Sequence, residues 1–169
     1  MRGKIEILGY HLTQIIMSFL KDPNRMPESF GVRIGIGLIV YFVIMHLVGL
    51  SHHVELRLLN LLILVTGVYL ALKKFKETHG DHLNYFRALA TGVATAAIGS
   101  FIFAVFLFAY MKLDSSLMES IVTNEPMGRY LNPYIASFIV ALEGLFSGLL
   151  VTFILINFVT TDEVNEPQG

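Results

Sequence analysis

Residues 137–159 read SFIVALEGLFSGLLVTFILINFV, and this stretch decides the fold class of the chain. A helix needs roughly 20 consecutive apolar residues to cross the hydrocarbon core of a bilayer, and this stretch is long enough. Glu143 is its only charged residue. The stretch is therefore predicted to be a membrane-spanning helix, and the reason for a carboxylate inside it becomes the main question.

The composition of the whole chain supports a membrane protein. Of its 169 residues, 54% are hydrophobic and 15% are charged, whereas soluble domains carry about a quarter charged residues. The net charge of −1 gives no sign of a nucleic-acid partner. The absence of cysteine excludes disulfides, thiolate metal sites and cysteine nucleophiles.

Four apolar blocks are predicted to span the membrane, namely 30–50, 56–72, 88–111 and 134–159. We therefore expect an all-α, polytopic membrane protein built as a four-transmembrane-helix bundle, with a transmembrane domain at 28–160 and a polar tail at 161–169. The segment SSLMESIV, within the 112–133 connection, is predicted to form a short surface helix.

A separate leader precedes the first span. Its apolar residues fall at helical spacing and polar residues take the other side, which is typical of an amphipathic helix lying in the membrane interface. We expect this N-terminal amphipathic interfacial helix at 1–24, ended by the proline-containing turn KDPNRMPES. The apolar positions are Ile5, Leu8, Leu12, Ile15, Ile16 and Phe19.

The distribution of positive charge predicts the orientation. Cytoplasmic loops of membrane proteins are enriched in Lys and Arg. With four spans, nine of the 12 Lys and Arg fall on the side that holds both termini and the loop between spans two and three. Both termini are therefore expected in the cytoplasm, and the other side carries only Arg57, Lys112 and Arg129.

Small residues recur on the predicted helices, where they let membrane helices approach closely. GxxxG patterns occur in the first and fourth spans, and the third span has a face rich in Gly and Ala. We interpret these faces mainly as the packing surfaces of a compact bundle. The candidate helix-packing glycines are Gly31, Gly35, Gly92, Gly99, Gly144 and Gly148.

Four polar residues fall at similar depth in the predicted outer half of the membrane. His46 and Asn60 lie about one turn from the outer ends of their helices, Tyr110 lies at the outer end of its helix, and Glu143 lies two to three turns in. We predict a candidate intramembrane polar cluster of His46, Asn60, Tyr110 and Glu143.

Glu143 and the Gly144/Gly148 stripe occupy different faces of the fourth span, so both cannot point to the bundle centre. We expect Glu143 to face inward, because a carboxylate that faces lipid costs at least a few kcal/mol. The glycine stripe would then be available to a second copy or another subunit. The alternative has the glycine stripe inside and Glu143 outside.

Glu143 has three interpretations. It can serve a proton-linked switch or bind a polar substrate, it can join two helices through one hydrogen bond worth on the order of 1 kcal/mol, or it can reach the outer headgroups. His52, His53 and Glu55 lack the spacing of a metal site, and no catalytic constellation, metal site or cofactor site is predicted.

The stretch FKETHGDHLNYFRALATGVATAAIGSFIFAVFLFAYMKLD resembles the central segment of a bacterial family catalogued as domain of unknown function 4199. The resemblance lies in a basic loop with a Gly-polar-aromatic turn, followed by a Gly/Ala-rich third helix. It covers most of 30–160, and the matching positions are Gly80, Phe86, Ala88, Gly92 and Tyr110. The resemblance implies an integral protein of the bacterial inner membrane and no assigned activity.

These observations favour a small, non-enzymatic membrane component, with the lipid bilayer as its first partner. It would self-associate as a homo-oligomer or join a larger membrane complex through its Gly-rich helix faces. The alternative function is a small oligomeric transporter or channel, with a polar pocket around Glu143.

Overall fold

The computed structural model describes residues 25–49, 57–79, 85–124 and 127–161. Every element in these ranges is helical: α2 (Met26–Leu47), α3 (Arg57–His79), α4 (Tyr85–Leu113), α5 (Ser115–Asn124), the 3-10 turn η3 (Gly128–Tyr130) and α6 (Pro133–Thr161). Four of them are long and apolar enough to cross a membrane. The predicted all-α bundle with four spans is confirmed, whereas the leader helix at 1–24 lies outside the described residues.

Local sequence signals explain where these helices begin and end. Pro27 lies in the first turn of α2 and suits a helix start, because its missing N–H would have no partner there. After α2, Gly49 adopts a positive φ of 74° and its N–H donates to the carbonyl of His46. At the start of α6, the Asn132 side chain accepts a hydrogen bond from the N–H of Ile135 at 2.9 Å.

The sequence also bears on the short helix α5 and on the end of α3. The predicted surface helix SSLMESIV is present as α5, Ser115–Asn124. The apolar block of the second span ends at residue 72, and α3 continues past it to His79, directly before Gly80, the residue type that commonly ends a helix. Hydropathy marks where the apolar block ends, whereas Lys, Phe and Glu in KKFKETH are compatible with a helix that continues past it.

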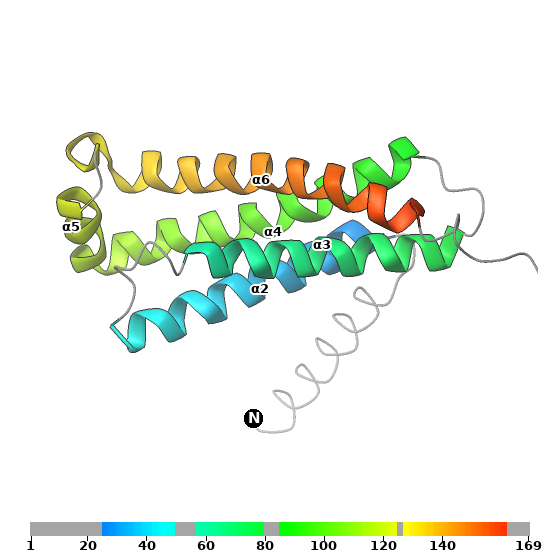
Figure 1. The fold of residues 1–169 in the computed structure, drawn as a ribbon. Coiled ribbons are helices and arrows are strands. Elements are labelled where there is room, and N and C mark those ends of the chain that lie inside the picture. The colour runs from blue at the N-terminus through cyan, green and yellow to red at the C-terminus, as the bar shows by residue number, and fades with distance from the viewer. Residues whose placement is uncertain (1–24, 50–56, 80–84, 125–126, 162–169) are drawn as a thin grey trace, which may run out of the picture.

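The four long helices lie side by side and alternate in direction, and α5 lies across one end (Figure 1). This end, called the α5 end, holds the C-termini of α2 and α4 and the N-termini of α3 and α6. Helix α4 has the most extensive contacts, with α2 and α6, while α3 contacts α2, α4 and α6. The bundle is therefore organised around α4.

Small residues explain how closely α4 approaches its two neighbours. A methyl group added to Gly31 of α2 would lie 2.7 Å from the Cβ of Ile98, and one added to Gly99 would lie 2.8 Å from Ile34. Facing α6, a methyl on Gly92 would collide with Thr152, and a methyl on Gly148 would collide with Ala96. Both helix pairs therefore depend on the absence of side chains at their crossings.

The expectation that the fourth span leaves its glycine stripe for a second subunit was wrong. Gly144 lies against Ser100 of α4, and Gly148 lies against Ala96, so the glycine stripe of α6 packs inside the chain and is not left for a second subunit. The physical reason is complementarity: Gly92, Ala96 and Ser100 form a ridge of small residues on α4 that receives the stripe. Glu143, one residue away, is turned out of this contact and its side chain is exposed.

Polar and apolar residues are distributed as expected for helices in lipid. Thr95 and Thr152 are fully buried, and each hydroxyl donates to the carbonyl four residues earlier, at 2.7 and 2.6 Å. Many large apolar side chains remain exposed, including Phe101, Phe146 and Phe158, each about two-thirds exposed. Such a surface in water would be an aggregation site, whereas lipid tails cover it without penalty.

Candidate functional site

A groove of about 320 Å³ lies at the α5 end, between the membrane-spanning helices. Its lining comes from all four long helices, and Leu117 and Ile121 of α5 close one end of it. Apolar residues make up most of the wall, for example Leu64, Phe103 and Val140. The volume is at the low end of the roughly 300–1,000 Å³ typical of small-molecule sites.

Five polar side chains interrupt the apolar wall of the groove, and they come from four helices. They are Tyr41 of α2, Asn60 of α3, Ser100 of α4, and Glu143 and Ser147 of α6. Among the described residues that line the groove, Glu143 is the only carboxylate, and there is no Lys, Arg or His. The groove therefore combines an apolar wall with a few convergent polar groups, which is the usual composition of a ligand pocket.

Asn60 is the best-defined polar group of the groove. Its Oδ1 atom is buried and has no hydrogen-bond partner among the described residues. Most buried polar atoms in proteins have a partner, and an unsatisfied one costs about 1–3 kcal/mol. A ligand can donate a hydrogen bond to this oxygen once the Asn60 side chain turns it toward the groove.

Glu143 lies on the open side of the same groove. Its side chain is exposed in the single chain, and the described residues offer it no hydrogen bond or ion pair. A carboxylate at membrane depth normally faces a partner or a water-filled cavity. Its place in the groove wall brings it to the same cavity as Asn60, although the two residues come from helices that are far apart in the sequence.

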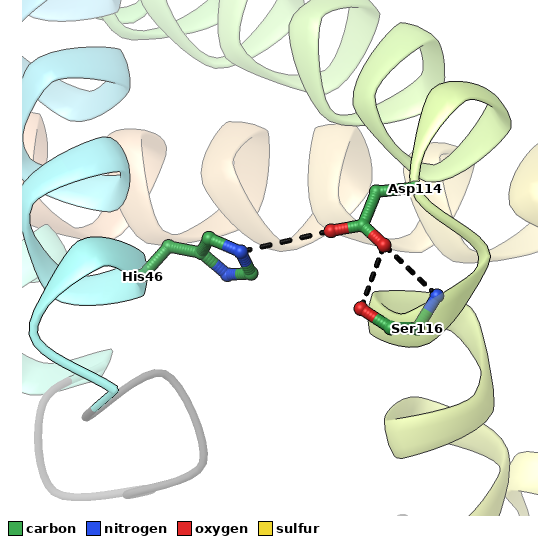
Figure 2. A network of polar contacts seen from close by, with 3 residues as sticks. All are labelled: His46, Asp114 and Ser116. Atoms are coloured by element: carbon green, nitrogen blue, oxygen red, sulfur yellow. Dashed lines mark hydrogen bonds and ion pairs between the residues drawn. The ribbon is translucent and has the colours of Figure 1, made fainter.

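His46 and Tyr110 lie elsewhere, between α2 and α4. Their rings are 5.3 Å apart in an edge-to-face arrangement, and the ring of Phe42 stacks on His46 with centroids 6.1 Å apart. The Nε2 atom of His46 lies 3.6 Å from Oδ2 of Asp114, which is ion-pair distance when His46 is protonated (Figure 2).

Asp114 connects this aromatic cluster to α5. Its Oδ1 atom accepts hydrogen bonds from the backbone N–H of Ser116 at 3.0 Å and from the Ser116 hydroxyl at 2.6 Å (Figure 2). This is the geometry of an N-cap residue. The Ser116 hydroxyl and backbone N–H lower the pKa of the Asp114 carboxyl below its usual value, with smaller contributions from His46 and Tyr110.

The four residues of the predicted polar cluster thus separate into two pairs. Asn60 and Glu143 line the groove, whereas His46 and Tyr110 form an aromatic contact between α2 and α4. Successive residues of a helix point about 100° apart, and the next residue, Met111, lines the groove where Tyr110 does not. Similar depth in the membrane was therefore insufficient to bring all four together.

Sequence reasoning missed several groups at these sites. Asp114 was overlooked because it follows the apolar block, although Asp-Ser-Ser before a short helix is a recognisable N-cap signal. Tyr41 and Ser100 were also missed, and no spacing in the sequence distinguishes them from other polar residues of the spans. Within the described ranges, no three His, Cys, Asp or Glu side chains gather so that they could hold a metal ion. His52, His53 and Glu55 lie outside these ranges.

Comparison with known proteins identifies one family. The family model described as "Protein of unknown function (DUF4199)" matches residues 29–159 of the chain. No curated protein and no solved structure matches it. The match covers the four spans, the groove and the aromatic cluster.

Proposed function

The chain belongs to the family described as protein of unknown function DUF4199, and we propose that it is a non-enzymatic membrane protein that binds a small amphiphilic molecule. The binding site is the groove lined by Asn60 and Glu143. A role in self-association through the glycine faces has lost its support, because those glycines contact other helices of the same chain.

The observation that carries this proposal is the mixed character of the groove. Its apolar wall suits an alkyl chain or another oily group, and Asn60, Glu143 and Ser147 offer polar contacts. An amphiphile, with one polar group and one apolar part, has the same two-part character.

We propose a bacterial inner membrane location with both termini in the cytoplasm. The support is the uneven distribution of Lys and Arg, since Arg33, Lys73 and Lys76 belong to the end of the bundle opposite α5. The groove then opens in the outer half of the membrane.

Photolabelling tests the binding function. The purified full-length chain is placed in nanodiscs of phosphatidylcholine and labelled with a diazirine derivative of dodecanol. We expect the label on groove residues of α3 and α6, around Asn60 and Val140, mapped by mass spectrometry. Excess dodecanol should reduce this labelling, because both alcohols compete for one groove.

A filled-groove variant provides the control. Ala136→Phe places a ring among lining residues, and it should reduce labelling at Val140 at least several-fold. Labelling of Phe158, which is exposed near the other end of the bundle, should stay unchanged because it reports general contact with the probe. Equal labelling of Val140 and Phe158, insensitive to dodecanol and to the filled groove, would refute the binding function.

A further inference from the structure

We propose that the polar end of the bound amphiphile is a positively charged amine, held between Glu143 and Asn60. This inference rests on the binding function proposed above and names the ligand's chemical class. It begins from the chemistry of the groove wall, whose described residues present one carboxylate together with hydroxyl and amide groups and no cationic side chain.

The first support is charge. A carboxylate in a low-dielectric environment is strongly stabilised by a nearby positive charge, and membrane proteins usually supply one from a neighbouring helix. The described residues supply none to Glu143, and the lining contains no Lys, Arg or His. A ligand with an ammonium group provides the missing charge.

The second support is hydrogen bonding. The buried Oδ1 atom of Asn60 is an acceptor without a donor. An ammonium group has three N–H donors and no acceptor, so one group can donate to Glu143 and, once the Asn60 side chain turns its Oδ1 toward the groove, to Asn60 as well. A carboxylate or phosphate head would leave Asn60 unsatisfied and would repel Glu143.

The size of the groove limits the ligand. Tyr41, Phe42 and Phe103 contribute to its wall, and Phe42 and Phe103 lie in edge contact with ring centroids 6.2 Å apart. A groove of about 320 Å³ holds one alkyl chain or a compact molecule, so the ligand class is a single-chain amphiphilic amine.

Competition between two probes of equal chain length tests this assignment. Dodecylamine and dodecanol are each titrated against the photolabel in phosphatidylcholine nanodiscs at neutral pH. For the native chain we expect dodecylamine to compete at a concentration at least tenfold lower than dodecanol. In Glu143→Gln this ratio should fall below about twofold, while competition by dodecanol stays unchanged, because only the charge has been removed.

Two further variants separate the contributions. Asn60→Leu removes the buried acceptor, so it should weaken competition by the amine and by the alcohol alike. Glu119→Gln is the matched control: Glu119 is an exposed glutamate of α5 that is absent from the groove wall, and its loss should leave the tenfold preference intact.

The outcomes distinguish the two proposals. Equal competition by amine and alcohol in the native chain, or an amine preference that persists in Glu143→Gln, would overturn the amine assignment and leave the groove as a binding site. Absence of groove labelling by the dodecanol probe would overturn the binding function itself.

Discussion

At the scale of single residues, Asp114 connects three helices through its polar contacts. It caps α5 through Ser116 and lies beside His46 of α2. The side chain thus joins the end of α4, the start of α5 and the end of α2. Because α5 residues Leu117 and Ile121 line the groove, the position of α5 at its end depends on this capping contact.

Removal of the cap should loosen α5. In Asp114→Ala, the N–H of Ser116 loses its acceptor, so we expect several-fold faster amide hydrogen exchange in the first turns of α5. Exchange within α4 should stay close to that of the native chain. Ser115→Ala is the matched control, since the neighbouring serine is exposed, and equal effects of the two substitutions would contradict the assigned cap.

The lowered pKa of Asp114 predicts a pH dependence of α5 stability. The ordinary pKa of an aspartate carboxyl is 3.8, and that of Asp114 is lower in the folded state. The ionised carboxyl therefore stabilises the folded state at pH values above 3.8, and this stabilisation is lost as the pH falls through the folded pKa. Exchange of α5 amides, corrected for the intrinsic rate, should therefore accelerate in acid below about pH 4. In Asp114→Asn this acceleration should vanish, and a variant that keeps it would assign the effect to another group.

At the scale of elements, α4 determines the packing because small residues let two neighbours approach it closely. It receives the α6 stripe on one face, at Ser100 and Ala96, and the α2 glycines on another, at Ile98 and Ile102. The remaining surface of α4 helps to line the groove through Phe103, Leu107 and Met111. The same helix that holds the bundle together therefore also forms part of the proposed binding site.

Adding one methyl group should destabilise the protein where two helices are in close contact and have little effect where they are further apart. Gly148→Ala places its Cβ in collision with Ala96, whereas a Cβ on Gly37 of α2 would meet only Ile63 at 3.4 Å, an ordinary contact. We expect Gly148→Ala to lower the free energy of unfolding by about 1–3 kcal/mol, and Gly37→Ala to change it by at most about 0.5 kcal/mol. Unfolding by sodium dodecyl sulfate in mixed micelles measures both, and equal stability of the two variants would refute the close α4–α6 contact.

At the scale of the whole molecule, an apolar belt and an uneven charge distribution relate the bundle to its membrane. Exposed residues such as Phe101 and Leu150 cover the middle of the bundle. Lys73 and Lys74 of α3 belong to the end opposite α5, and the Lys76 ammonium there donates to the carbonyl of Val159 at 2.7 Å, close to the C-terminus of α6. A cation at this helix end compensates the carbonyls that the last turn leaves unpaired.

Cysteine labelling tests the proposed orientation, because the native chain has no cysteine. A membrane-impermeant maleimide on intact cells should label Glu119→Cys, which lies on α5, and should label Lys73→Cys only after permeabilisation. Both positions are exposed in the structure, so reactivity reports the side of the membrane. The reverse pattern would place the groove in the cytoplasmic half and invalidate the orientation derived from Lys and Arg.

The sequence by itself determined the class and the layout of this protein. Long apolar blocks have few stable structures in lipid, because each backbone polar group needs a partner within its own segment, so the four spans followed from hydropathy alone. The short helix α5 was also predicted, since the apolar residues of SSLMESIV recur at the spacing of one helix face. These are local properties, and each was read from a single segment.

Only the tertiary structure decided which faces meet. Glu143 and Gly144 are adjacent in sequence, and either face of α6 satisfied the local pattern. The close fit of Gly144 and Gly148 against Ser100 and Ala96 selected the glycine face and placed Glu143 at the groove. Such a choice depends on the shapes of two helices together, because dispersion contacts between small residues arise only when both backbones approach.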